Sequence, residues 1–158
     1  MSIEDIKQFK DNFDCPTDYG DLTHDGVDIM SKSGIDTPII AVDDGTIWRI
    51  SLIDGVGYEI YQILGFDTEK KPVIAQYVHL DKIDVSEGQM IKKGTIIGYV
   101  NKYDHLYFAI RIGYKPRMEF PSDDNPGDEV DITDILLKFI PKNKIGYDDR
   151  IRHTCRKY

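Results

Sequence analysis

The chain has 158 residues, of which 41% are hydrophobic, enough for one compact domain with a core of its own plus a short appendage. The formal net charge of −8 argues against a body that binds nucleic acid or an anionic membrane through bulk electrostatics. No apolar run approaches the ~18 residues of a membrane span, and the first residues lack the basic and apolar regions of a secretory signal. We therefore expect a protein that stays where it is made, unless a leader has been removed.

The first predicted element is a short helix within an N-terminal segment of residues 1–23. Ile3, Ile6 and Phe9 recur at a spacing that puts them on one side of such a helix. Cys15 also lies in this segment, whereas Cys155 lies near the other end of the chain, so the two do not form a disulfide framework. We expect free thiols, unless the fold brings the two cysteines together.

The middle of the chain, between Val27 and Ile112, consists of short segments rich in Ile, Val and Tyr that are separated by glycine-containing turns. This pattern is typical of antiparallel strands. The predicted strands are Val27 to Met30, Pro38 to Val42, Thr46 to Ile53, Tyr58 to Leu64, Val73 to Leu80, Ile96 to Val100 and His105 to Ile112. Many short strands in this order predict a β-sandwich or a closed sheet.

The β region, residues 24–115, is followed by a connector, a helix and a basic tail within residues 116–158. Pro116 to Gly127 is rich in Pro, Asp and Gly, as expected of a connector. Ile132 to Ile140 has apolar residues at helical spacing behind the capping residue Asp131, which predicts an amphipathic helix packed on the sheet.

Charge is concentrated at the C-terminal end. From Lys138 to Tyr158, seven Lys and Arg stand against two Asp, which leaves +5 there and −13 on the remainder. The ordinary interpretation is a solvated tail, and the sharper one is a segment that docks onto an acidic partner, such as another copy of the acidic body.

Three of the four histidines lie in or beside the predicted strands. His24 and Asp28 flank Gly26 at the start of the first strand. His79 ends a strand in which alternation puts it on the same face as Tyr77. A lone histidine on a strand is more often a packed or surface residue than a metal ligand, so the order and spacing of these motifs must carry the argument.

The last predicted strand carries the third histidine. Alternation gives one face to Leu106, Phe108, Ile110 and Ile112, and the other to His105, Tyr107, Ala109 and Arg111. Because the apolar face belongs to the core, His105 and Tyr107 lie side by side on the opposite face, where the floor of a groove would be.

Three motifs in this order resemble those of the lysostaphin-like (LytM-type) peptidoglycan zinc endopeptidases, of the β-lytic metallopeptidase kind. They are His24-Asp25-Gly26-Val27-Asp28, Tyr77-Val78-His79-Leu80 and His105-Leu106-Tyr107-Phe108. The resemblance extends to Pro38 to Ile47 and Val85 to Gly98, and covers about His24 to Ile112. It implies an all-β fold, an antiparallel β-sandwich or a barrel like the duplicated hybrid motif, with short terminal helices.

The resemblance also implies roles for the motif residues. His24 and Asp28 match two zinc ligands, whereas His79 and His105 match the catalytic histidines that position water and stabilise the tetrahedral intermediate. Tyr107 stands where the family has its third ligand, a histidine.

Two further departures from the family pattern are visible. Ala109 replaces a common glutamate. Only Asn101 to Asp104 separate two strands that the family joins by a longer loop bordering the substrate groove.

The tyrosine at position 107 decides what to expect of the metal. Catalytic zinc takes three protein ligands and a water. A phenol has a reference pKa of about 10, so deprotonating it at pH 7 costs roughly 4 kcal/mol before any gain from the metal, although zinc can lower that pKa. Tyrosine is also longer than histidine. We therefore expect zinc to be absent or weakly bound.

The favoured hypothesis is a degenerate peptidase domain in which hydrolysis is lost or weak. Such a domain would bind peptidoglycan peptide, regulate a relative, or serve as a structural module of a larger assembly such as a phage virion or a division complex. The family is usually extracellular or periplasmic, whereas the lack of a signal sequence here favours an intracellular or virion-associated protein unless a leader was removed.

Two other classes remain as alternatives. The first is an active zinc metalloendopeptidase that cleaves peptidoglycan, with zinc on His24, Asp28 and either His105 or Tyr107, and with His79 as general base. The second is a carrier domain, because Glu87 to Gly98 looks like half of a biotinyl or lipoyl hammerhead. A carrier needs a modifiable lysine at a hairpin tip, typically flanked by Met or Ala, and none of the lysines here has that setting.

Overall fold

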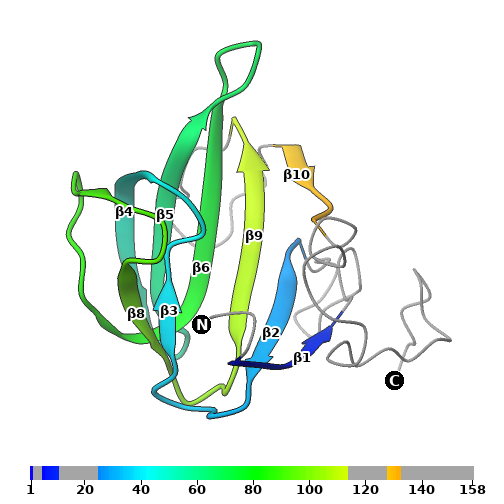
Figure 1. Cartoon of the computed structure of the whole chain (residues 1–158), viewed down its shortest axis with the longest axis vertical. Helices are drawn as coiled ribbons and strands as arrows, with labels where there is room; N and C mark the ends of the chain where they lie inside the picture. Colours follow the sequence, from blue (N-terminus) through cyan, green and yellow to red (C-terminus); the bar gives the residue numbers. More distant parts are fainter. Residues whose placement is uncertain (2–4, 11–24, 114–127, 133–158) are drawn as a thin grey trace, which may run out of the picture.

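The computed structural model describes residues 1, 5–10, 25–113 and 128–132 (Figure 1). In these residues the chain forms ten strands. They are β1 (Ile6–Lys10), β2 (Val27–Ser31), β3 (Pro38–Ile40), β4 (Gly45–Ile53), β5 (Gly57–Phe66), β6 (Pro72–Ile83), β7 (Met90–Ile91), β8 (Ile96–Val100), β9 (Leu106–Ile112) and β10 (Asp128–Val130). Nowhere in the described segments is there an apolar helix long enough to span a bilayer.

The strands form one antiparallel sheet that curls because β6 changes partners along its length. Its main order is β1-β2-β9-β6-β5-β4-β7, and β10 pairs with β9. The first part of β6 pairs with both β5 and β9, whereas its end, from Leu80 to Ile83, pairs with β8, which in turn pairs with β3. The β3–β8 pair therefore folds back over the long strands, and the predicted all-β, antiparallel fold class is confirmed.

The core lies between the long strands and the β3–β8 pair. It draws fully buried side chains from both, including Ile39 of β3, Ile97 of β8, Ile47 of β4, Ile60 of β5 and Leu80 of β6. The strands β2 and β9 belong to the same main sheet and add their apolar side chains to this core, so the residues of the main sheet alternate between the core and the opposite face.

One buried polar group connects the core strands to the turn after β3. The Tyr77 hydroxyl donates to Gln62 Oε1 at 2.7 Å and accepts from the Val42 amide at 3.1 Å, while Gln62 Nε2 donates to the Asp43 carbonyl at 2.7 Å. Burial raises the pKa of Tyr77, so this hydroxyl stays protonated as a donor. The network satisfies polar groups that the core would otherwise leave without partners.

The strand prediction holds for all seven segments, with boundaries that differ by up to three residues. It omitted β1, β7 and β10, which are short and have no alternating pattern of their own. Each exists because a neighbouring strand offers an edge to pair with: β2, β4 and β9 respectively.

The predicted N-terminal helix is wrong over the residues that the structure describes. Residues 6–10 form β1, antiparallel to β2, with Ile6 buried against the core. Backbone pairing along β2 therefore outweighs the helical spacing of three apolar residues. The predicted C-terminal helix, its connector, the basic tail and both cysteines lie outside the described residues, apart from Ile132, which is buried.

We predict that Tyr77→Phe lowers the free energy of unfolding by about 1 to 3 kcal/mol, because it leaves the Val42 amide and the Gln62 side chain without their buried partner. Urea unfolding measures the loss. Tyr58→Phe is the matched control, since no described residue hydrogen-bonds to its half-buried hydroxyl. Equal losses in the two variants would contradict the role assigned to the buried network.

Candidate functional site

The face of the sheet that looks away from the core carries the candidate residues. The backbone register places Asp28 of β2 opposite Tyr107 of β9, and Tyr107 opposite Val78 of β6. Directly opposed residues share a face, so these three side chains form a row across three strands. His24 lies outside the described residues, although Asp25 and Gly26, which follow it, are described.

His79 reaches this face through a β-bulge in β6. Tyr58 pairs with Leu80 and Ile60 with Tyr77, so Val78 and His79 together oppose the single residue Glu59. His79 has a φ of 69°, in the left-handed region. The expectation that His79 shares a face with Tyr77 is therefore wrong: Tyr77 is in the core, and the extra residue moves His79 to the opposite face.

The rings of His79 and His105 lie against each other, with centroids 4.7 Å apart. His79 Nδ1 lies 3.3 Å from the Val56 carbonyl, and His105 Nδ1 lies 2.8 Å from the Tyr103 carbonyl. A carbonyl only accepts hydrogen bonds, so each Nδ1 is the donor in these contacts, and in the neutral imidazole the lone pair is then on Nε2. His105 Nε2 lies 3.6 Å from Asp28 Oδ1, and both side chains are largely buried.

Tyr103, in the short loop between β8 and β9, holds both histidines. Its ring packs on His79 at 4.8 Å between centroids, and its carbonyl accepts from His105. Its hydroxyl donates to the Gly55 carbonyl, and its amide donates to Asn101 Oδ1 at 2.9 Å. The short loop between β8 and β9 thus serves as a brace, a role that the sequence pattern did not indicate.

Tyr107 points away from the histidines. Its hydroxyl donates to the Asp25 carboxylate, which also accepts from Arg111. The strands β2 and β9 are antiparallel, so moving from Asp28 back to Asp25 on β2 follows the same direction as moving from Tyr107 on to Arg111 on β9. His105 lies in the opposite direction from Tyr107. The phenol therefore extends along the sheet to an ion pair and not toward the histidine cluster.

Gly26 makes room for this arrangement. A Cβ at Gly26 would lie 2.7 Å from Tyr107 Cζ and 2.6 Å from the Phe108 carbonyl oxygen. The glycine of the first motif thus lets the tyrosine ring cross the start of β2, and a side chain there would displace the ring.

The hydrogen bonds continue from Arg111 into the neighbouring strands. Arg111 is 3% exposed, and its Nε donates to Gln76 Oε1 at 2.7 Å. Gln76 Nε2 donates in turn to Glu59 Oε1 at 2.5 Å and to the Tyr61 hydroxyl at 3.3 Å. Burial raises the pKa of Glu59. The sequence pattern predicted the face of Arg111 but not the rest of this network, although Gln76 stands out as a polar residue inside an apolar strand.

The donor set is incomplete for a metal within the described residues. No three side chains of the His, Cys, Asp and Glu type lie close enough there to hold an ion. Asp28 and His105 converge, and the motif would add His24, which lies outside the described residues. Tyr107, which the resemblance puts at the position of the third ligand, is engaged with Asp25.

Two braced histidines lie beside an aspartate on one face of a curled antiparallel sheet, the face on which the sequence predicted the floor of a groove. The chain belongs to Peptidase family M23, which it matches over residues 22–118. Members of this family are zinc-dependent metallopeptidases.

Among curated proteins, the chain is 34% identical over 94 residues to an uncharacterized metalloprotease of Haemophilus influenzae. The match covers 56% of this chain but only 18% of that protein, so the chain spans less than a fifth of the length of this relative.

Two solved structures share the fold. The first is the catalytic domain of lysostaphin from Staphylococcus simulans, with a TM-score of 0.63 and 23% identity over 85% of this chain and 95% of that one. The second is a zinc-containing peptidase from Vibrio cholerae, with a TM-score of 0.53 and 22% identity over 72% and 36%.

We predict that Glu59→Gln stabilises the protein at pH 7, because a carboxylate whose pKa is raised by burial is costly to ionise in the folded state. The folded protein holds this proton more tightly than the unfolded chain, so the cost appears as the pH rises above 4.5 and vanishes below it. The urea midpoints of variant and parent should therefore differ at pH 7 and coincide at pH 4. Glu69→Gln, at an exposed carboxylate, is the control. A stabilisation of the same size at both pH values would refute this assignment.

Proposed function

We propose that this chain is a degenerate M23 domain that keeps the scaffold and groove of a peptidoglycan metallopeptidase, with hydrolysis lost or weak. It acts as a binding, regulatory or structural module of a larger assembly, such as a phage virion or a cell-wall or division complex. The observation that carries this proposal is the orientation of Tyr107, whose hydroxyl donates to Asp25 beside Arg111.

Zinc does not fit the described side chains as they stand. To become a ligand, Tyr107 would have to lose its proton, leave Asp25 and turn toward Asp28. That change removes the hydrogen bond from Tyr107 to Asp25 and leaves the ion pair between Arg111 and Asp25. The cost adds to the roughly 4 kcal/mol needed to deprotonate a phenol at pH 7. A site of two ligands, His24 and Asp28, is weak for zinc.

The groove is nevertheless well suited to binding. His79 and His105 are each anchored to a backbone carbonyl, and Tyr103 braces both through its ring and its carbonyl. Side chains that are already fixed in this way can contact an extended peptide at little further cost in ordering. We therefore propose a peptidoglycan peptide or a protein segment as the ligand. The basic tail, residues 138–158, would dock onto an acidic partner.

A second candidate function is an active zinc metalloendopeptidase that cleaves peptide bonds of peptidoglycan. The approach of His105 Nε2 to Asp28 Oδ1 at 3.6 Å favours it, because a nitrogen and a carboxylate already converge there. In this alternative His105 replaces Tyr107 as the third ligand.

We predict that protein purified without chelator holds less than one zinc per chain and does not clear a cell-wall suspension. Tyr107→His should raise zinc affinity by more than the ~10-fold to ~100-fold that outer-shell changes typically cause, because it restores a nitrogen donor. Competition with a chromophoric chelator measures the affinity.

Tyr107→Phe is the matched control, since it also removes the hydroxyl from Asp25 but adds no donor. Zinc affinity should rise in the histidine variant alone. Stoichiometric, tightly bound zinc in the parent protein, together with clearing of the suspension, would replace the first proposal by the second.

A further inference from the structure

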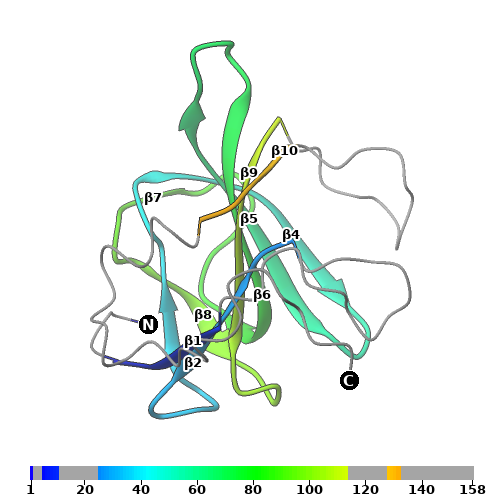
Figure 2. The same ribbon diagram turned by 90° about the vertical axis from the view of Figure 1, so that its right-hand side faces the viewer.

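The β5–β6 hairpin projects beyond the rest of the sheet (Figure 1 and Figure 2). Its tip, residues 66–71, is held by its own hydrogen bonds: Asp67 Oδ1 accepts from the amides of Glu69 at 2.9 Å and Lys71 at 2.8 Å. At the base of this turn Phe66 is 67% exposed. A large aromatic side chain on a braced, projecting turn can be buried in a partner at little further cost in ordering.

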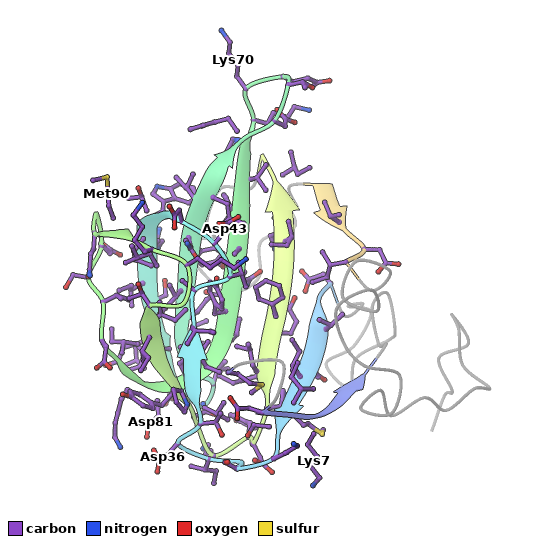
Figure 3. The ribbon with its side chains drawn as sticks, viewed as in Figure 1. Lys7, Asp36, Asp43, Lys70, Asp81 and Met90 are labelled. Carbon is purple, nitrogen blue, oxygen red and sulfur yellow. The ribbon has the colours of Figure 1, made fainter. Side chains whose placement is uncertain are left out.

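The tip also carries a lysine that forms no ion pair with a described residue. Lys71 pairs with Glu69 at 2.9 Å, whereas Lys70 has no ion pair among the described residues and extends outward from the turn (Figure 3). The tip thus combines one exposed aromatic ring with one ammonium group that forms no ion pair with a described residue, while the carboxylates of the tip are engaged, Asp67 with backbone amides and Glu69 with Lys71.

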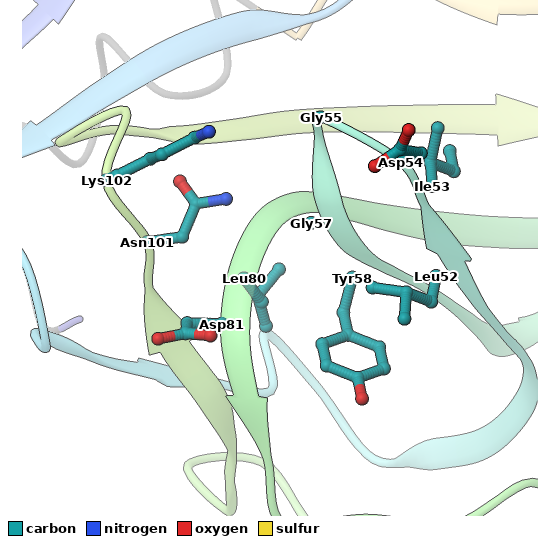
Figure 4. A pocket seen from close by; sticks show the side chains of 10 residues that line it. All are labelled: Leu52, Ile53, Asp54, Gly55, Gly57, Tyr58, Leu80, Asp81, Asn101 and Lys102. Atoms are coloured by element: carbon teal, nitrogen blue, oxygen red, sulfur yellow. The ribbon is translucent and has the colours of Figure 1, made fainter.

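A hollow of about 430 Å³ lies at the other end of the same two strands (Figure 4). Its apolar lining comes from Leu52, Ile53, Tyr58 and Leu80, and Leu52 is 68% exposed. Asp54 and Asp81 also line it, and neither forms an ion pair with a described residue. None of the candidate residues of the groove takes part in the lining.

The hollow is complementary to the hairpin tip in both shape and charge. It is large enough for a phenylalanine side chain, and its two carboxylates suit the Lys70 ammonium. Lys102 also lines the hollow, but its Nζ lies over the Tyr103 ring, 5.4 Å from the centroid. We propose that the hollow receives the hairpin tip of a second copy of this chain, with Phe66 among its apolar residues and Lys70 beside Asp54 and Asp81.

The two surfaces lie at opposite ends of β5 and β6: β5 begins at Gly57, beside the hollow, and ends at Phe66. A contact between them is therefore head-to-tail and leaves one tip and one hollow unused in every pair, so copies add in a row. The assembly does not depend on whether the groove hydrolyses or binds peptide.

The test is sedimentation velocity of the full chain over a concentration series. One aromatic ring and one or two ion pairs make a small interface, so association is expected at about 0.1 to 1 mM. Phe66→Ser and Leu52→Lys should each weaken it at least tenfold, whereas Met90→Ser, at a residue 84% exposed on β7, should leave it unchanged. A monomeric parent protein at ~1 mM, or association that survives Phe66→Ser, overturns the proposal.

Mixing the two defective variants makes the test specific. Phe66→Ser keeps the hollow and Leu52→Lys keeps the tip, so an equimolar mixture should form dimers and no longer species. Continued absence of dimers in the mixture, with both variants folded by circular dichroism, also overturns the proposal. The groove and its metal content are untouched by either change, so this outcome is separate from that of the Tyr107→His experiment.

Discussion

The Asp25 carboxylate accepts hydrogen bonds from both Tyr107 and Arg111, and the chemistry of the groove depends on this interaction. Arg111 is almost fully buried, so it needs a charged partner, and Asp25 supplies one. With its hydroxyl bound there, the phenol is directed along β9 away from His105. Tyr107 is therefore part of the polar network of the sheet.

The groove and the core are built from the same strands. They lie on opposite faces of the sheet because successive side chains of a strand point to opposite faces. On β9, Phe108 packs on Tyr77 in the core while Tyr107 faces the groove. The histidines are then fixed by contacts that alternation does not control: backbone carbonyls at Val56 and Tyr103 orient the two imidazoles. Such a frame suits recognition as well as catalysis, because in both cases the acceptor atoms are held in place before the ligand arrives.

Periodicity was enough to predict the seven principal strands, the all-β class and the face of β9 that holds His105 and Tyr107, because these follow from local pattern. It could not predict β1, whose existence depends on the edge of β2. Nor could it predict the face of His79, since a bulge of one residue leaves no mark in the alternation of apolar side chains. The partner of Tyr107 was equally hidden, because only the pairing of β2 with β9 brings Asp25 close to Tyr107 and Arg111.

The bulge serves the placement of the histidine and not the core. Tyr77 and Leu80 both lie in the core, and regular alternation puts one residue between two such positions, whereas β6 has two, Val78 and His79. Removing either one would restore regular pairing with β5 and would keep Leu80 in the core, opposite Tyr58. The left-handed backbone that brings His79 beside His105 would be lost, so a single deletion at this point would separate the two imidazoles without turning the core residues of β6 to solvent.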